Sequence, residues 1–475
     1  MSVIRTELKK KIDEWFNLHA DEMIADLGKI IAINSVRGEA RPGMPYGEAS
    51  RAVLDVAAEM LTKRGFAADV FEDIILTADL GPAPPKMGIL AHLDIVDAGT
   101  GWDTDPLTLV EKDGNLYGRG ATDNKGPSVA AMYAMYCVSE IFPQLAHGCR
   151  IILGSGEESG CEDIAQYIAK VAPPPNVFTP DAGFPIVNTE KGRLAPVFGA
   201  KWQEDKTLPR VVSIDGGKTK NVVPEYAEAV VEGIGLDAAQ QFCTEYSEKT
   251  GAKISASADG DKIKFTAIGK AAHAAAAFDG NNTQTALLQM LSAMPFADSE
   301  GFGYIKALNR LFPHGDTYGH ALEINMRDEI TGDLTVNFGV LKFTLTGFDG
   351  DFDSRTPVCA DEVDLVGIVT KAFEREGIVI ADVADMGSSK SHHTPKDTPF
   401  VQSLLQIYEE YTGNKGECLS MGGQTYVHNI PGGVAFGTSI LGNENVHSAN
   451  EFIGKEHLIL CAKIFAQVII DVCGE

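Results

Sequence analysis

The chain has 475 residues, which is too long for one ordinary hydrophobic core, so two domains are expected. Hydrophobic residues make up 44% and charged residues 22% of the sequence, a balance typical of soluble globular proteins. The net charge of −26 would repel a nucleic acid duplex or an anionic membrane, so neither is expected as a partner. No apolar run reaches the roughly 18 residues of a membrane span, and the N-terminus has no apolar signal-peptide core.

The cysteines give a further exclusion. All eight are scattered along the chain, and no two of them form a C-x-x-C pair. This spacing argues against a zinc knuckle and against a disulfide framework, and it favours reduced thiols and a cytoplasmic location. Cysteine is therefore excluded as a metal ligand or nucleophile. The residues are Cys137, Cys149, Cys161, Cys243, Cys359, Cys418, Cys461 and Cys473.

The first part of the chain alternates between helical and strand-like apolar patterns. Helices are expected over residues 5–33, 47–64, 128–142 and 164–171, and strands over 87–91 and 149–153. This β/α alternation predicts a mixed, mostly parallel sheet covered by helices. In such sheets a ligand site gathers beyond the carboxyl ends of the strands.

The pattern changes after Thr189. Half-buried strands are expected over residues 211–214, 227–234, 262–269, 334–340 and 342–346, with a helix over 283–291. From about Met386 the chain again resembles its first part, and it ends in an apolar helix over 456–472. The fold class predicted is therefore a two-domain α/β protein. One domain is formed by residues 1–190 and 385–475, and an inserted α+β domain is formed by residues 191–384.

Polar residues follow the short apolar runs of the first domain. His92 and Asp94 come after one run, Asp123 lies in a glycine-rich segment, and the pair Glu157–Glu158 comes after another run. A lone histidine at a strand end is more often simply hydrogen-bonded, and two glutamates in a turn are usually solvated. Their joint occurrence at successive strand exits favours a metal centre, because a two-metal hydrolase needs imidazole and carboxylate ligands together with a base.

Three segments carry a resemblance to a known family. His92-Leu-Asp94, Gly118-Arg-Gly-Ala-Thr-Asp-Asn-Lys-Gly126 and Glu157-Glu-Ser-Gly160 resemble the signature segments of the M20 family of metallopeptidases, and within it those of the PepV-type dipeptidases. The likeness runs from Ile33 to the last helix. It implies two divalent metal ions, and Zn, Mn or Co would suit a set of two histidines and three carboxylates.

The resemblance also implies which residues hold the metals. Asp123 would bridge both ions, His92 and Asp181 would complete one site, and Glu158 and His447 would complete the other. Family members carry a cis peptide bond after the bridging aspartate, which here is the bond between Asp123 and Asn124. An aspartate at the position of Asp181 is similar to the aminopeptidase and dipeptidase branch, whereas acylase relatives carry glutamate there.

Two further residues near the metals receive catalytic roles from the same resemblance. Glu157 would be the general base, which takes a proton from a metal-bridging water or hydroxide and passes it to the leaving amine. Asp94 would orient the imidazole of His92, since ligand histidines usually donate their second N–H to a carboxylate or carbonyl.

The inserted domain contains a second set of candidates. His273, in Gly269-Lys-Ala-Ala-His273, resembles a lid histidine that donates a hydrogen bond to the developing oxyanion. Asn221 and Arg355 resemble residues that bind the C-terminal carboxylate of the substrate, a task that suits the planar fork of arginine. The plainer alternatives are a histidine satisfied by its neighbours at position 273 and a surface ion pair at Arg355.

A glycine-rich segment, Met421 to His428, resembles a substrate loop of the family, and its Gly422 and Gly423 are candidate substrate-binding residues. The sequence departs from the family pattern at Gln424, where a glycine is common, and at His428, where an arginine is common. These departures concern side-chain specificity rather than metal binding. The run Ser391-His392-His393 has no counterpart in the family's site, and a loop is expected there.

The residues and the resemblance together predict a dinuclear metallopeptidase that hydrolyses dipeptides or other short peptides with a free N-terminus. One alternative is an N-acyl-amino-acid amidohydrolase on the same scaffold, and a more distant alternative is a non-catalytic peptide-binding protein. The long inserted domain is similar to a doubled lid that supplies its histidine and asparagine within one chain. A monomer is therefore expected, with a dimer as the alternative.

Overall fold

The computed structural model describes residues 2–383, 386–439 and 444–474. The chain forms two compact units: the first contains the residues up to Thr189 and those from His392 onward, and the second contains Glu190–Ser391. The two-domain α/β class expected from the sequence is confirmed. The expected domain boundary between residues 384 and 385 lies outside the described residues.

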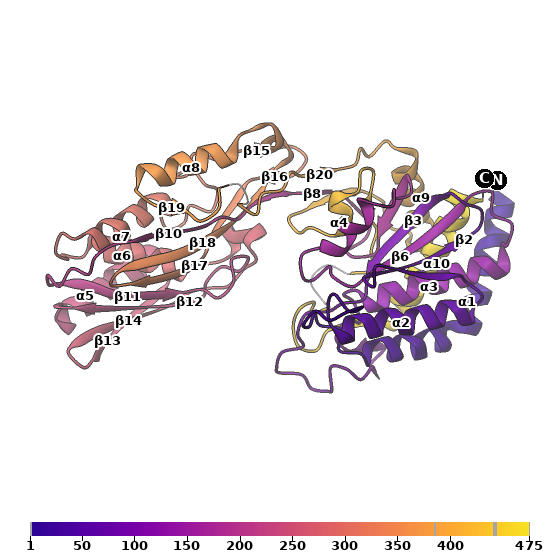
Figure 1. Ribbon diagram of the computed structural model, residues 1–475, viewed down its shortest axis with the longest axis horizontal. Coiled ribbons are helices and arrows are strands. Elements are labelled where there is room, and N and C mark those ends of the chain that lie inside the picture. Colours follow the sequence, from indigo (N-terminus) through magenta and orange to yellow (C-terminus); the bar gives the residue numbers. More distant parts are fainter. Residues whose placement is uncertain (1, 384–385, 440–443, 475) are drawn as a thin grey trace. The chain divides into compact units, whose positions relative to one another are not determined.

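The first unit is built on a mixed sheet (Figure 1). Its central strands β6, β3, β7 and β22 are parallel to one another, and the flanking pairs β1–β2, β2–β6 and β22–β8 are antiparallel. Across the sheet the strands are β1 (Ala68–Phe71), β2 (Ile75–Leu80), β6 (Gly148–Gly154), β3 (Pro85–His92), β7 (Asn176–Thr179), β22 (Val434–Ala435), β8 (Ile186–Glu190) and β20 (His392–His393), with β21 (Cys418–Met421) paired to β8.

Both faces of this sheet are covered. The larger core lies under α1 (Ser2–Ile31), α2 (Glu48–Lys63), α3 (Lys125–Ile141), α9 (Pro399–Thr412) and α10 (Lys455–Cys473). A smaller core lies under α4 (Glu162–Ile168) and the short helix η3 (Tyr426–Asn429). Ile89 and Ile151 belong to the larger core and Leu90 and Ile152 to the smaller one, as the alternation of side chains along a strand requires. The central strands are therefore apolar throughout.

A small three-stranded sheet completes the first unit. It contains β4 (Val110–Lys112), β5 (Asn115–Tyr117) and β23 (Phe452–Gly454), with β5 in the centre. Phe452 pairs with Tyr117 across β23 and β5. This pairing brings the chain that follows His447 beside the chain that leads to Asp123.

The second unit contains an antiparallel sheet. Its strands, in order, are β13 (Lys253–Asp259), β14 (Lys262–Ile268), β12 (Tyr226–Glu232), β11 (Arg210–Gly216), β17 (Thr335–Thr344), β18 (Gly347–Thr356), β10 (Val197–Lys201) and β19 (Val379–Ile380), and β9 (Gly192–Leu194) pairs with β18. Along β12 every second residue is buried, so one face of the sheet carries the core.

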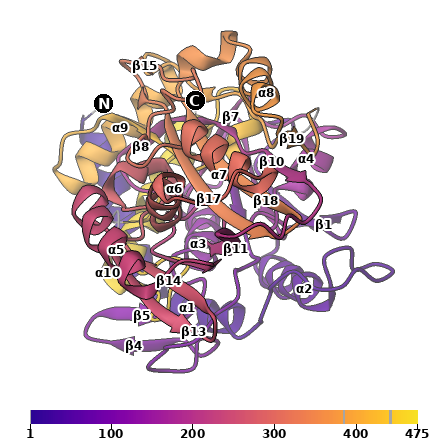
Figure 2. The ribbon, with the colours of Figure 1, turned by 90° about the vertical axis from the view of Figure 1, so that its left-hand side faces the viewer.

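Helices cover that buried face of the second unit. Figure 2 looks onto α5 (Leu236–Thr250), α6 (Thr283–Ala293) and α7 (Glu300–Leu311), which lie over the strands. The core also includes residues of α8 (Leu365–Arg375). Shorter elements are η1 (Ala274–Asp279), η2 (Val358–Glu362), β15 (Arg327–Asp328) and β16 (Gly332–Asp333).

Two local expectations from the sequence are wrong. Residues 334–340 and 342–346 do not form separate strands, because β17 continues through a bulge between Phe338 and Val340. The run Ser391–His393 is not simply a loop, because His392 and His393 form β20 at one end of the first sheet. In the part of the chain that the structure describes, no helix is long and apolar enough to cross a membrane.

Candidate metal centre

Three parallel strands of the first unit end beside one another. His92 is the last residue of β3, Glu157 and Glu158 follow the end of β6, and Asp181 follows the end of β7. Since β6 and β7 both pair in parallel with β3, their carboxyl ends meet at one edge of the sheet. The expectation that these polar residues stand at neighbouring strand exits is confirmed.

Asp123 lies between two histidines. Its Oδ1 atom is 3.1 Å from Nε2 of His92, and its Oδ2 atom is 2.9 Å from Nε2 of His447. Each histidine has a second carboxylate close by. Oδ2 of Asp181 is 3.6 Å from His92 Nε2, and Oε1 of Glu158 is 3.2 Å from His447 Nε2. The two oxygens of one carboxylate thus belong to two separate ligand groups.

The ligand atoms of these groups are close enough to share metal ions. In each of two sets, His92 with Asp123 and Asp181, and Asp123 with Glu158 and His447, the candidate atoms lie within 4.8 Å of one another. Imidazole nitrogen and carboxylate oxygen are donors that Zn, Mn and Co accept. The donor set therefore fits two divalent ions that share Asp123.

Asp94 connects His92 to the segment that carries the two glutamates. Its carboxylate is 3.4 Å from Nδ1 of His92, and it accepts the backbone N–H groups of Glu157 at 3.2 Å and Glu158 at 3.0 Å. Nδ1 of His92 also lies 3.1 Å from the carbonyl oxygen of Asp94. With Nδ1 directed at these acceptors, Nε2 is the ring atom turned toward Asp123 and Asp181, as a ligand histidine requires.

His447 lies on a tight loop after the last strand of the large sheet. Asn445, His447 and Asn450 all have positive φ angles, 52°, 58° and 61°, and the side-chain amide of Asn445 donates to the carbonyl of Asn450 at 3.1 Å. The His447 side chain is 54% exposed, whereas His92 is fully buried. The two candidate metal positions therefore differ in their access to solvent.

The crowding of charged groups shifts the pKa of both histidines and of Asp123. Burial alone would lower the pKa of His92, but the charge of Asp181 and hydrogen bonds to Asp123 raise it well above its ordinary value. Hydrogen bonds to Asp123 and Glu158 raise the pKa of His447 to about 11. Burial would raise the pKa of Asp123, but hydrogen bonds from both histidines lower it. Because ligand histidines bind a metal in their neutral form, bound divalent ions would compete with protons at this group.

Glu157 belongs to neither of the two ligand groups that contain Asp123. It is half-buried, and one of its carboxylate oxygens lies within 4.8 Å of ligand atoms of His92 and Glu158. Burial, the largest cause, and the charges of Asp181 and Glu158 raise the pKa of Glu157 well above that of an ordinary glutamate. A carboxylate with a raised pKa beside a metal centre is suited to accept and return a proton.

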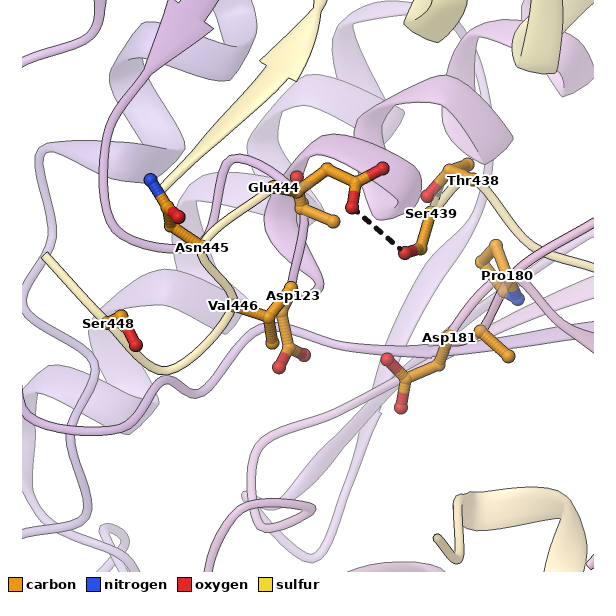
Figure 3. A pocket seen from close by; sticks show the side chains of 11 residues that line it. Asp123, Pro180, Asp181, Thr438, Ser439, Glu444, Asn445, Val446 and Ser448 are labelled. Carbon is orange, nitrogen blue, oxygen red and sulfur yellow. Dashed lines mark hydrogen bonds between the residues drawn. The ribbon is translucent and has the colours of Figure 1, made fainter. Parts of the chain in front are cut away.

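A pocket of about 530 Å³ opens beside these residues. Figure 3 shows the carboxylates of Asp123 and Asp181 on its wall, with Glu444 and Ser439 on another side. The hydroxyl of Ser439 donates to the carboxylate of Glu444 at 3.3 Å. The volume falls in the range of small-molecule binding sites, about 300–1,000 Å³.

Several residues that support the site were not singled out from the sequence. Asn124 donates its side-chain amide to Asp181 at 3.1 Å, and the bond between Asp123 and Asn124 is cis, which confirms the expectation drawn from the resemblance. The hydroxyl of Ser128 donates to the carbonyl of His92 at 3.0 Å. Both residues stand in or next to the Gly118–Gly126 segment, so their closeness to Asp123 in sequence was an available signal.

Tyr426 links the glycine-rich segment to the metal centre. Its ring stands edge-on to His92 with 6.2 Å between the ring centres, and its hydroxyl donates to the buried carboxylate of Asp163. A Cβ at Gly154 would lie 2.0 Å from that hydroxyl, so only glycine fits at the end of β6. This packing joins residues that are far apart in the sequence, so no local sequence pattern predicts it.

The other candidates of the glycine-rich segment lie around Tyr426. Gly422 and Gly423 are half-buried between β21 and η3. The two positions at which the sequence departs from the family pattern contact each other: Nε2 of Gln424 and Nε2 of His428 are 3.2 Å apart. His392 lies beside this segment, with 6.3 Å between its ring centre and that of His428, and its Nε2 is 2.8 Å from the carbonyl oxygen of Gly433.

In the second unit, His273 and Asn221 lie on neighbouring backbone segments. Val222 forms a β-bridge with His273, and the N–H of Ala274 donates to the carbonyl of Asn221 at 2.8 Å. Nδ1 of His273 accepts the N–H of Ala275 at 3.1 Å, so the neutral ring carries its proton on Nε2. In this tautomer Nε2 is a hydrogen-bond donor, which is the form that an oxyanion requires.

Arg355 lies on β18 and is largely buried. Its Nε and Nη2 atoms contact the fully buried carboxylate of Asp353 at 2.6 and 3.2 Å, and Arg193 contacts the same carboxylate at 2.6 Å. Two guanidinium groups thus share one carboxylate. A planar guanidinium can also bind a substrate carboxylate, although the ion pair with Asp353 is a sufficient structural role for Arg355.

Comparison with known proteins gives concordant results. The model of peptidase family M20/M25/M40 matches residues 88–471. The chain is 31% identical over 458 residues to the protein named "Putative dipeptidase YtjP" of Bacillus subtilis (strain 168), covering 95% of this chain and 97% of that one. It is 30% identical over 456 residues to Beta-Ala-Xaa dipeptidase of Lactobacillus delbrueckii subsp. lactis, covering 95% and 96% of the two chains.

A solved structure has the same fold. Human carnosine dipeptidase 1 is similar with a TM-score of 0.57 and 16% sequence identity, and the match covers 98% of each chain. At this identity the likeness concerns the fold alone.

Proposed function

Because this chain belongs to peptidase family M20/M25/M40, we propose that it is a metal-dependent dipeptidase with a dinuclear centre in its first unit. The observation that carries the proposal is the position of Asp123, whose two oxygens face His92 at 3.1 Å and His447 at 2.9 Å. A carboxylate placed in this way is a suitable bridge between two ions. The names of the relatives, both dipeptidases, support the substrate class.

The residues divide into ligands and reacting groups. His92 and Asp181 would hold one ion, Glu158 and His447 would hold the other, and Asp123 would be shared. Bound divalent ions would lower the pKa of a water molecule and would polarise the carbonyl of the substrate. Asp94 keeps the ring of His92 and the backbone of both glutamates in place, so the ligand geometry exists before the substrate binds.

Glu157 is the proposed general base. It accepts the proton of the attacking water and returns it to the nitrogen of the scissile peptide bond, so that the amine leaves in neutral form. Its raised pKa favours this exchange, because a carboxylate of ordinary pKa would release the proton too readily and would be a weak base near neutral pH.

The second unit supplies the proposed substrate contacts. His273 donates a hydrogen bond to the oxyanion that forms during attack, and its Nε2–H tautomer supports this role. Asn221 and Arg355 are the proposed groups that bind the C-terminal carboxylate of the dipeptide, and Gly422 and Gly423 are proposed substrate-binding residues of the first unit. The planar guanidinium of Arg355, which can meet a carboxylate in two hydrogen bonds, supports an anionic ligand.

The test is a hydrolysis assay with metal-stripped enzyme, to which Zn, Mn or Co is added separately. The substrates are dipeptides with a free N-terminus and the matching N-acetyl amino acids. We expect amino acids to be released from dipeptides only after a metal is restored. Cleavage of the N-acetyl substrates alone would move the protein to the acylase alternative, and metal binding without any turnover would favour a peptide-binding protein.

We further propose that the enzyme acts as a monomer in the cytoplasm. Its inserted unit contains both the histidine and the asparagine of the proposed substrate site, so one chain holds the complete residue set. The eight free cysteines suit a reducing compartment. Sedimentation at micromolar concentration should give one species of the 50.8 kDa mass of the chain, and a dimer alone would contradict the proposal.

A further inference from the structure

Glu451 is a buried carboxylate that neither binds metal nor reacts in the proposed mechanism. It is 0% exposed and follows His447 by four residues. Burying a carboxylate is costly unless hydrogen bonds compensate for the lost water. The partners of Glu451 therefore indicate what its charge is used for.

Those partners are the backbone groups that lead to the bridging aspartate. Oε1 of Glu451 accepts the N–H of Thr122 at 2.9 Å and the N–H of Asp123 at 3.1 Å. Oε2 accepts the N–H of Gly120 at 3.1 Å and Nη1 of Arg119 at 2.6 Å. Both oxygens are thus occupied by donors from one short segment of the chain.

The backbone around Glu451 reinforces the same connection. The carbonyl of Glu451 accepts the N–H of Gly118 at 3.0 Å, and the carbonyl of Phe452 accepts the hydroxyl of Thr122 at 2.7 Å. The charge is balanced inside the protein, because Arg119 is itself 1% exposed and lies beside the carboxylate. Glu451 therefore joins the segment that ends in Asp123 to the loop that begins at His447.

We propose that Glu451 is a positioning residue, which fixes Asp123 relative to His447 and thereby sets the affinity of the metal site that these two residues share. The inference rests on the proposed dinuclear centre and adds to it a residue that controls one of its two positions. The site of His92 and Asp181 depends less on Glu451, because its other ligands follow strands β3 and β7.

Glu451→Gln tests this assignment without creating a cavity. The amide keeps one oxygen, and the charged Arg119 would attract that oxygen to the position of Oε2. The amide NH₂ would then face the N–H groups of Thr122 and Asp123, so two donors would meet two donors. The substitution therefore removes a hydrogen bond from the backbone N–H of Asp123.

The measurement is titration of the metal-free protein with Mn²⁺ by calorimetry, at constant pH. Wild type should bind two ions, and E451Q should bind the first with nearly unchanged affinity and the second about 10- to 100-fold more weakly, the usual effect of removing a residue that orients a ligand. Asp26→Asn is the matched control, because Asp26 is another buried carboxylate of the first unit, hydrogen-bonded to Tyr133 and Lys29. Glu451→Asp, which keeps the charge, should lie between wild type and E451Q, and it carries the test if E451Q does not fold.

The outcomes separate this inference from the proposed function. Two ions bound by E451Q with wild-type affinities would overturn the role of Glu451 alone. The same loss in D26N would indicate a general effect on folding and would also overturn it. An equal loss of both ions in E451Q would show that Glu451 does not act on one position, and it would overturn the inference too. A wild-type protein that binds no metal would contradict the dinuclear centre itself, and with it this inference.

Discussion

In the first unit His92, Glu158 and Asp181 stand at the ends of three parallel strands, whereas in the second unit His273 and Asn221 lie on paired segments outside the strands of an antiparallel sheet. The first group is held by buried carboxylates, those of Asp94 and Glu451, which bind backbone N–H groups. The second pair is held by backbone bonds between neighbouring segments. We therefore expect changes at the supporting carboxylates of the first unit to act on metal binding, and changes at His273 to act on turnover.

The largest expected effect concerns the base of the first unit. Glu157→Ala should lower kcat by about 10²–10⁴-fold, because general acid–base catalysis typically contributes this much. Metal content should remain nearly unchanged, since His92, Asp123, Glu158, Asp181 and His447 are all retained. Steady-state kinetics together with metal analysis checks both expectations. Glu162→Gln, an exposed glutamate nearby, is the control, and retained activity in E157A would remove Glu157 from the mechanism.

A smaller effect is expected from the second unit. His273→Ala should lower kcat by about 10²–10³-fold, the usual loss when one oxyanion donor is removed. The bound metal should not change, because the candidate ligands belong to the first unit. Histidine 320 of the same unit is exposed, and His320→Ala provides the comparison. A loss of metal in H273A would contradict the division of tasks between the units.

Substitution of Asp94, which supports the candidate metal centre, should change metal affinity. Asp94→Ala removes the acceptor of the Glu157 and Glu158 N–H groups and the partner of His92 Nδ1. Metal affinity should fall about 10- to 100-fold, and added metal should restore much of the activity. Metal titration followed by assay at saturating metal tests this, with the exposed Asp97→Ala as control. Activity that stays low at saturating metal would give Asp94 a direct role in the reaction.

The smallest effect distinguishes the two interpretations of Arg355. Arg355→Lys keeps a positive charge beside Asp353 but removes the planar fork, so KM should rise about tenfold with little change in kcat if Arg355 binds the substrate carboxylate. If Arg355 serves only the ion pair with Asp353, KM should stay constant and Tm should fall. Kinetics and thermal unfolding on the same preparation decide between them.

The first unit was largely predictable because its signals are local. Apolar runs followed at once by His92 and by Glu157 mark buried strands and their exits, and both expectations hold. The role of Glu451 was not predictable, because its donors lie more than 300 residues earlier in the chain. Arg355 and Asp353 are two residues apart on a strand and therefore share a face, a signal that was present, whereas Arg193 reaches them only through the pairing of β9 with β18.

The second unit was less predictable for related reasons. Its strands alternate between buried and exposed residues, so their existence could be expected, but β18 and β13 carry too many polar residues to stand out. The bulge at Gly339 interrupts the alternation of apolar residues in the sequence, although β17 pairs with β18 on both sides of the bulge. Such features are set by pairing with distant strands, and a single sequence does not contain that information in local form.

The chain leaves the large sheet of the first unit through β8 and returns through β20, its neighbour. The two crossings are tied together: Asn188 donates to the carbonyl of Thr394 at 2.7 Å, and the hydroxyl of Thr189 lies 2.8 Å from Nδ1 of His393. About two hundred residues therefore begin and end at almost the same point, and the entropic cost of closing a loop grows only slowly with its length. A gene in which a short turn replaces this stretch would still encode every candidate ligand, because all of them belong to the first unit.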